Sequence, residues 1–419
     1  MKMWIYVVRR AALVVPIIIG VMTITFVLVN ALGPVQQITS AFGPPPPHGT
    51  IKTYDPTIPC SEIHPNATGM CANPLYELHA SQLGLNKPIF VQWGIYLYRS
   101  LTFQWGYTAN FSSSTKSTFF GSVIRGKPVT EVFSWVLPYT LELAVLSLVI
   151  ILAVALPLGR LSAVNRNRAV DQGSRILSFS GYAFPAFLLA SLAVLAFVLA
   201  VGAGTLVHSP WCPSGETTYS EITGSWPSVL ETGACSYPGA VASAFGFPAW
   251  LSYGVISHPT GFPTVDALIH GDYWLALDTL ARMILPALII AFGTIAVLLR
   301  YVRNSMLEVM NMDYVRSARS KGVPESTVIK RHVGRNSMGA TLTVLGLLFA
   351  AFLAGFPVIE DVFQLNGIGL MITYSVLGQQ GFDFGIIFGS VLLFTLLVVA
   401  ANLIVDVLYA YLDPRVRLG

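Results

Sequence analysis

Charged residues are scarce in this chain of 419 residues: they make up 11% of it, whereas apolar residues reach 54%. Soluble domains usually contain about 25% charged residues, so the composition excludes an ordinary globular protein. The sequence also lacks a GxxxxGK[ST] phosphate-binding loop, an HExxH pair and any CxxC spacing. These absences argue against an ATPase, a zinc hydrolase and a structural zinc site within this chain. We therefore expect no catalytic residues, no metal site and no bound cofactor.

The apolar residues form six blocks long enough to cross a bilayer, which takes about 20 residues in a helix. Five blocks contain no charge, and the second contains only Glu142. Because lipid offers no partners for backbone polar groups, helices are expected, and the chain is predicted to be an all-α membrane protein with six transmembrane helices. The blocks are approximately Ala11–Leu32, Val132–Leu158, Ile176–Val207, Met283–Leu299, Asn336–Ile359 and Phe384–Val405.

The distribution of Lys and Arg predicts the orientation. If the N-terminus is inside, four segments face the cytoplasm and together hold 17 of the 24 Lys and Arg residues: 1–10, 160–175, 300–335 and 413–419. Basic residues near span ends favour the cytoplasmic side, so both termini are predicted to be cytoplasmic. The net charge of +4 then reflects topology and needs no nucleic-acid partner. The first block could be a cleavable signal peptide. However, its apolar run is about twice as long as the usual apolar core of a signal peptide, so an uncleaved span is expected.

The chain is therefore predicted to have five parts. Residues 1–32 form the N-terminal tail and first span, and 132–207 form spans two and three. Residues 282–419 hold spans four to six with a cytoplasmic loop at 300–335. Residues 33–131 and 208–281 are large extracellular loops.

All four cysteines lie in these outer loops: Cys60, Cys71, Cys212 and Cys235. An oxidising compartment favours disulfides, and four cysteines allow three pairings. Local pairing, with the first joined to the second and the third to the fourth, closes the shortest loops and is preferred here, although some cysteines could remain free. Asn66 and Asn110 begin N-x-S/T triplets, which makes them candidate glycosylation sites.

The most informative segment is 300–335, which carries eight Lys and Arg residues between two apolar blocks. A helix is expected from Asp313, ending where Gly322 takes a left-handed conformation, and Pro324 suits the first turn of the next helix. The resulting basic knob could sit in a groove of another protein. Alternatively, the loop could only enforce topology, or it could read nucleic acid as a helix-turn-helix. Nucleic-acid reading is disfavoured because the adjoining spans hold the segment at the membrane.

Two faces of this helix carry different residues. Tyr314, Ala318 and Lys321 follow helical spacing along one face, and the small Ala318 lets that face approach a partner closely. Arg316 and Arg319 share another face.

This segment, together with others along the chain, resembles the EAA-type coupling loop of ABC importer permeases of the dipeptide/oligopeptide/nickel branch. The strongest match is DYVRSARSKG at 313–322, which includes Ser317. Further similarities are YVVRR at 6–10, LGLNKP at 83–88, LPYTLEL at 137–143, LPA at 285–287 and NLIVDVLYAYLDPR at 402–415. The resemblance covers all six predicted spans.

The resemblance implies a type I permease bundle in the cytoplasmic membrane, paired with a second homologous permease. Residues 314–322 would sit in a cleft of an ATPase, two of which bind ATP and Mg²⁺, and an extracellular binding protein would deliver the substrate. Peptides are the first expectation, with oligosaccharides or nickel as alternatives. A stand-alone channel or ion-coupled carrier is a further alternative, although the internal repeats and paired buried charges expected of a carrier are not evident.

The sequence departs from this family at several points. Residues 336–340 read NSMGA where the family usually has a proline-containing run, so the helix that follows is expected to be less sharply kinked. Both outer loops are enlarged. Glu142 and Asp406 are ionisable residues within or beside spans, so each is a candidate for a pathway or structural role.

Overall fold

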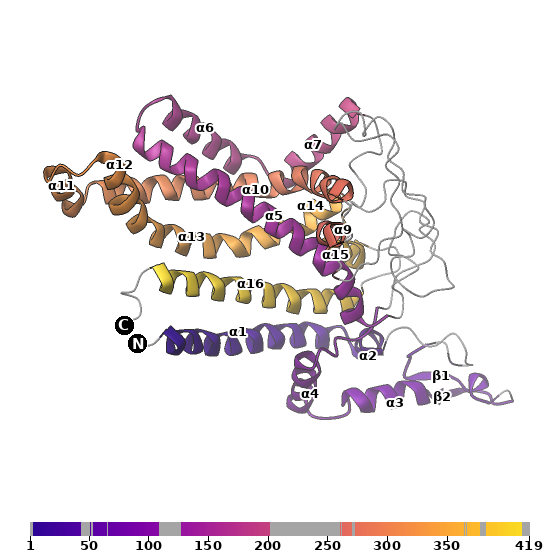
Figure 1. Ribbon diagram of the computed structural model, residues 1–419. Helices are drawn as coiled ribbons and strands as arrows, with labels where there is room; N and C mark the ends of the chain where they lie inside the picture. The colour runs from indigo at the N-terminus through magenta and orange to yellow at the C-terminus, as the bar shows by residue number, and fades with distance from the viewer. Residues whose placement is uncertain are drawn as a thin grey trace.

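A computed structural model describes residues 3–42, 51, 53–64, 66–108, 127–201, 260, 262–269, 273–363, 365, 367–377 and 383–412. Five long helices form a bundle in which α1 contacts α16, α16 contacts α13, α13 contacts α10, and α10 contacts α5 (Figure 1). Their bounds are Met3–Ala31 for α1, Val129–Val164 for α5, Tyr273–Met310 for α10, Arg335–Ala354 for α13 and Phe384–Leu412 for α16.

Four helical segments of the described chain are long and apolar enough to cross a membrane, and a bent pair of helices raises that number to five. The four are Ala12–Ala31, Val129–Val164, Thr279–Met310 and Phe384–Val405. The chain is therefore a mostly helical integral membrane protein. The segment Phe384–Val405 has the same bounds as the predicted sixth span. The segment Thr279–Met310 contains the predicted fourth span and continues well beyond its predicted end at Leu299.

The predicted third span is not one straight helix. Helix α6 (Ala169–Ala183) and helix α7 (Ala186–Val201) meet at an angle of 99°. Pro185 lies at the break, and Phe184 before it is extended, with φ −93° and ψ 122°. A proline disfavours helical geometry in the preceding residue and supplies no backbone N–H, so the helix ends there.

The predicted fifth span is also divided. Helix α13 ends at Ala354, and α14 (Phe356–Val362) begins after Gly355 with Pro357 in its first turn. Helix α15 (Ile368–Leu377) follows and packs against the bundle through contacts with α5, α14 and α16.

Helix α10 lies at the centre of the fold, because α5, α6 and α13 all pack on it. Its Ala287, Ala291 and Leu298 are fully buried. Gly181 lets α6 approach closely, since a Cβ there would lie 2.5 Å from the Cβ of Ala296. Small residues at such contacts are typical of membrane helices, which gain from close packing.

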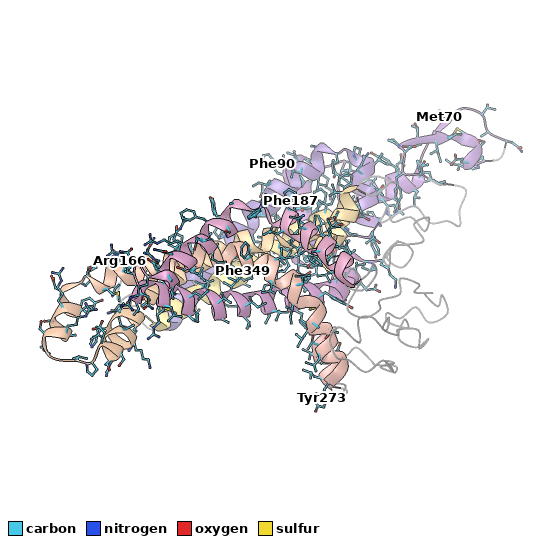
Figure 2. The ribbon with its side chains drawn as sticks, turned by 90° about the horizontal axis from the view of Figure 1, so that it is seen from above. Met70, Phe90, Arg166, Phe187, Tyr273 and Phe349 are labelled. Atoms are coloured by element: carbon cyan, nitrogen blue, oxygen red, sulfur yellow. A yellow bond between two sulfur atoms is a disulfide. The ribbon has the colours of Figure 1, made fainter. Side chains whose placement is uncertain are left out.

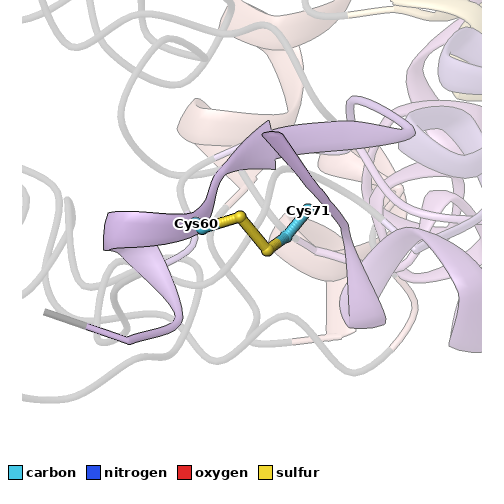
Figure 3. The surroundings of a disulfide bond; sticks show 2 residues. All are labelled: Cys60 and Cys71. Carbon is cyan, nitrogen blue, oxygen red and sulfur yellow. A yellow bond between two sulfur atoms is a disulfide. The ribbon is translucent and has the colours of Figure 1, made fainter. Parts of the chain in front are cut away.

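The predicted first outer loop contains several ordered elements among its described residues. It contains α2 (Pro34–Phe42), β1 (Thr57–Pro59), η1 (Cys60–Glu62), β2 (Met70–Ala72), α3 (Pro74–Leu83) and α4 (Ile89–Leu101). Strands β1 and β2 are antiparallel, and a disulfide joins Cys60 to Cys71, the local pairing predicted for them (Figure 3). Helix α4 is fixed to α1 by a 3.1 Å hydrogen bond from Trp93 Nε1 to Thr23 Oγ1.

Candidate coupling surface

Helix α11 (Asp313–Ser320) lies beyond the end of α10, and in Figure 1 it forms the left tip of the molecule. Helix α1 begins and α16 ends at this same end, whereas β1 and β2 lie at the opposite end (Figure 1). Figure 2 shows the same separation between Arg166 and Met70. The basic segment 300–335 therefore occupies one pole of the bundle.

The predicted helix stop at Gly322 is present. Gly322 has φ +74°, a left-handed conformation that costs about 1–2 kcal/mol for a residue with a side chain. The N–H of Lys321 donates to Ser317 O at 3.2 Å, and the N–H of Val323 donates to Ala318 O at 3.3 Å. These bonds satisfy carbonyls at the end of α11 and turn the chain sharply.

One face of α11 packs on its own chain, which corrects the role expected for Ala318. Val315 is fully buried and Ala318 is 8% exposed, and both belong to one hydrophobic cluster with Val328 and Val333. The partner of this face is η3 (Val328–Gly334), a seven-residue π-helix that leads into α13. The small side chain of Ala318 permits close packing within the chain, so it is not available to a partner.

The other residues predicted for docking are exposed. Tyr314 is 43% exposed and its hydroxyl accepts a 3.0 Å hydrogen bond from Asn336 Nδ2, which fixes the ring. Arg316 is also exposed, with its side chain only 3.7 Å from the fully exposed Asp313. The coupling surface is defined here as the exposed set Tyr314, Arg316, Ser317, Lys321, Gly322 and Pro324.

An ion pair joins α11 to the segment that follows the turn at Gly322. Arg319 donates from Nη2 to Glu325 Oε1 at 2.7 Å and from Nε to Glu325 Oε2 at 3.1 Å. Glu325 begins α12 (Glu325–Thr327), with Pro324 just before it. Arg319 holds the pKa of the Glu325 carboxyl below its usual range. The pair therefore fixes the angle between α11 and the segment that follows.

Glu325→Gln should lower the free energy of unfolding by only about 0.2–1 kcal/mol, because both side chains are exposed. The pKa of Glu325 is lowered by folding, so the contribution is present above its unfolded pKa and is lost as pH falls through the folded value. Thermal unfolding of both proteins at neutral and acidic pH measures this. A difference that persisted in acid would contradict the assignment.

Asp171 ties three helices together. It is fully buried, and its Oδ1 accepts from Arg303 Nε at 2.6 Å and from Ser162 Oγ at 2.7 Å. Its Oδ2 accepts from Arg303 Nη2 at 3.0 Å, Arg175 Nη2 at 2.8 Å and the Asn167 N–H at 2.9 Å. Ser162 is on α5, Asp171 is on α6 and Arg303 is on α10, so one carboxylate joins all three.

The sequence analysis did not single out Asp171 or Arg303. Both lie in segments identified only as cytoplasmic and basic. The one local signal is the spacing of Asp171 and Arg175, four residues apart on one helix, which favours an ion pair. The contact with Arg303, 132 residues away, has no local signal.

Glu142 lies in the N-terminal half of α5, far from Ser162, and makes a structural contact there. The N–H of Thr264, in the first turn of α9 (Pro263–Ile269), donates to its two carboxyl oxygens at 3.2 and 3.4 Å. Carboxylates stabilise helix N-termini by accepting from such free N–H groups. Of the two roles proposed for Glu142, the described geometry supports the structural one.

Glu360 is a second buried carboxyl group that the sequence analysis missed. It is 1% exposed and accepts from Thr140 Oγ1 at 2.8 Å and from the Gly369 N–H at 2.6 Å. Thr140 in turn accepts from the Ile368 N–H at 2.9 Å. Glu360 therefore joins α14 to α5 and to the N-terminus of α15.

The remaining candidate residues do not meet in one site. Asp406 lies in α16, and only its backbone is described. Asn66 is exposed in the turn between β1 and β2. Cys212, Cys235 and Asn110 lie outside the described residues. No cluster of His, Cys, Asp or Glu suited to a metal ion occurs in the part of the chain that the structure describes.

Comparison with known proteins identifies the family. The family model named binding-protein-dependent transport system inner membrane component matches residues 155–418, which is more than half of the chain. The chain belongs to this family. The matched region of this inner membrane component begins within α5 and includes Asp171, Arg303, Glu360 and the whole coupling surface.

Relatives of this inner membrane component match over most of its length. A probable D,D-dipeptide transport system permease protein of Escherichia coli is 32% identical over 348 residues, covering 83% of this chain and 86% of the relative. An oligopeptide transport system permease protein of Bacillus subtilis is 28% identical over 413 residues, covering 98% and 99%. A dipeptide transport system permease protein of Escherichia coli is 28% identical over 419 residues, covering 98% of both chains.

Proposed function

We propose that this chain is a permease subunit of an ATP-driven importer for peptides, located in the cytoplasmic membrane. The family is one of binding-protein-dependent transport components, and similar relatives are named for dipeptide and oligopeptide transport. The chain would pair with a second permease and receive its substrate from an extracellular binding protein. It would bind no cofactor itself, since ATP and Mg²⁺ would be held by two separate ATPase subunits.

The observation that carries this proposal is the coupling surface. It is exposed, it stands at one pole of the bundle, and its inner face is packed on the chain through Val315 and Ala318. A partner that pushed on α11 would therefore act on η3 and α10 through packed side chains. The fold would contain six spans with both termini cytoplasmic, which the location of 17 of 24 basic residues supports.

Ser317→Trp tests this function. Ser317 is exposed on α11 and helical, so tryptophan adds bulk to the docking face without straining the backbone. In the reconstituted transporter we expect substrate-stimulated ATP hydrolysis to fall by at least about tenfold, the effect of losing about 1.4 kcal/mol of subunit contact. Membrane insertion should be unchanged.

Arg168→Trp is the matched control, because Arg168 is an exposed residue of the other basic loop and lies outside the coupling surface. It should retain stimulated hydrolysis. Equal activity of the two variants, with the ATPase still bound to Ser317→Trp, would contradict a coupling role for α11.

A further inference from the structure

An open pocket of about 820 Å³ lies between α6 and α10, on the side of the bundle near Arg166 in Figure 2. Four arginines line it, and no Asp or Glu does: Arg166, Arg175, Arg300 and Arg303. Such a concentration of guanidinium groups around one concave surface attracts anions, and phosphate in particular.

Two of these arginines are not neutralised. Arg175 and Arg303 share the carboxylate of Asp171, which lies behind the pocket wall. Arg166 and Arg300 are exposed, and neither makes an ion pair within the described ranges. The pocket therefore keeps a surplus of positive charge at its rim.

The rest of the pocket is apolar and aromatic. Phe179 and Tyr182 on α6 are 70% and 77% exposed, and Leu299 forms part of the α10 wall. The hydroxyl of Ser178 also lines the pocket, and its oxygen is buried without a hydrogen-bond partner among the described atoms. A ligand for this surface needs an anionic oxygen-rich group joined to an apolar part.

The two halves of the pocket coincide with the predicted membrane boundary. The four arginines belong to the cytoplasmic segments 160–175 and 300–335, whereas the aromatic wall belongs to the predicted third span. Basic pockets between membrane helices on the cytoplasmic side suit phospholipid head groups. A free phosphate ion would use the arginines but leave the aromatic wall exposed.

We propose that this pocket binds an anionic phospholipid, with its phosphodiester held by Arg166 and Arg300 and an acyl chain lying along Phe179 and Tyr182. The site is independent of the transport assignment, because it requires only the membrane-embedded chain.

The experiment uses the full-length chain in phosphatidylcholine nanodiscs with increasing amounts of a photoactivatable phosphatidylglycerol. Labelling of peptides from α6 and α10, measured by mass spectrometry, should saturate. The double variant Arg166→Gln with Arg300→Gln should weaken this labelling by at least about tenfold, because each basic residue contributes to anionic-lipid attraction. Both residues are exposed, so the variant should fold.

The control variant, Arg168→Gln with Arg331→Gln, removes the same charge from exposed positions outside the pocket. It should leave labelling within about twofold of the wild type, an effect that corresponds to under about half a kcal/mol. An equal loss in both variants would reduce the effect to general surface charge and overturn the site. Displacement of the label by inorganic phosphate alone would overturn the lipid assignment.

Replacement of Tyr182 by a photocrosslinking amino acid distinguishes a lipid in the pocket from a protein that covers it. The proposal expects lipid adducts in native membranes. Crosslinking of that position to another polypeptide would show that a protein covers the pocket, which would overturn the proposal.

Discussion

Asp171→Ala is expected to lower the free energy of unfolding by about 3–5 kcal/mol, the usual effect of removing one member of a buried ion pair. Asp171 is fully buried, and the side chain of Arg303 is only 13% exposed. Without the carboxylate, the buried Ser162 hydroxyl loses its acceptor, and the mostly buried Arg303 guanidinium loses its negatively charged partner. Chemical denaturation of the purified protein in mixed micelles measures the change.

Asp313→Ala is the matched control, since Asp313 is fully exposed and its partner Arg316 lies 3.7 Å away. It should leave the free energy of unfolding close to the wild-type value, because exposed ion pairs contribute little. A double variant, Asp171→Leu with Arg303→Met, should recover much of the loss, because replacing both buried charges leaves neither unpaired. Equal effects of Asp171→Ala and Asp313→Ala would show that Asp171 does not join the helices.

Thr140→Val and Glu360→Ala should each destabilise the contact between α5, α14 and α15. Thr140 donates to Glu360 and accepts from Ile368, and Glu360 also accepts from Gly369. Each buried donor left without an acceptor costs about 1–3 kcal/mol. Glu360→Ala leaves at least two donors without an acceptor, so it should have the larger effect. That effect should be visible as faster hydrogen exchange in α15 and a lower melting temperature.

Thr373→Val provides the comparison for Thr140→Val. Its hydroxyl only donates to Gly369 O within α15, at 3.2 Å, so no distant helix depends on it. We expect this variant to stay within about 0.5 kcal/mol of the wild type, like most substitutions away from special features. If Thr140→Val behaved like Thr373→Val, the hydroxyl of Thr140 would not connect the helices.

Local patterns predicted several elements well. The charge-free block from Phe384 to Val405 is a helix with those bounds as its apolar part. The Gly322 turn and the Cys60–Cys71 disulfide also follow from short-range chemistry, namely a left-handed glycine and the nearest available thiol. Each of these depends on residues close together in the sequence.

Other features depend on signals that hydropathy does not register. The bend at Phe184 and Pro185 divides a block that stays apolar on both sides, so composition alone shows one span. Ala318 is small enough either for a partner or for its own chain, and only the position of η3 decides between them. Asp171 and Glu360 lie just outside apolar blocks, where charged residues are common, and their partners are distant in sequence.

The inward packing of α11 has a mechanical consequence. Val315 and Ala318 belong to the same cluster of buried side chains as Val333, Leu298 and, far along α5, Tyr139. Protein interiors are close-packed and nearly incompressible, so a displacement at one end is transmitted through such a cluster with little absorption. The protruding tip is therefore packed continuously with the bundle, and under the proposed coupling role a small tilt of α11 would displace side chains as far away as Tyr139 on α5.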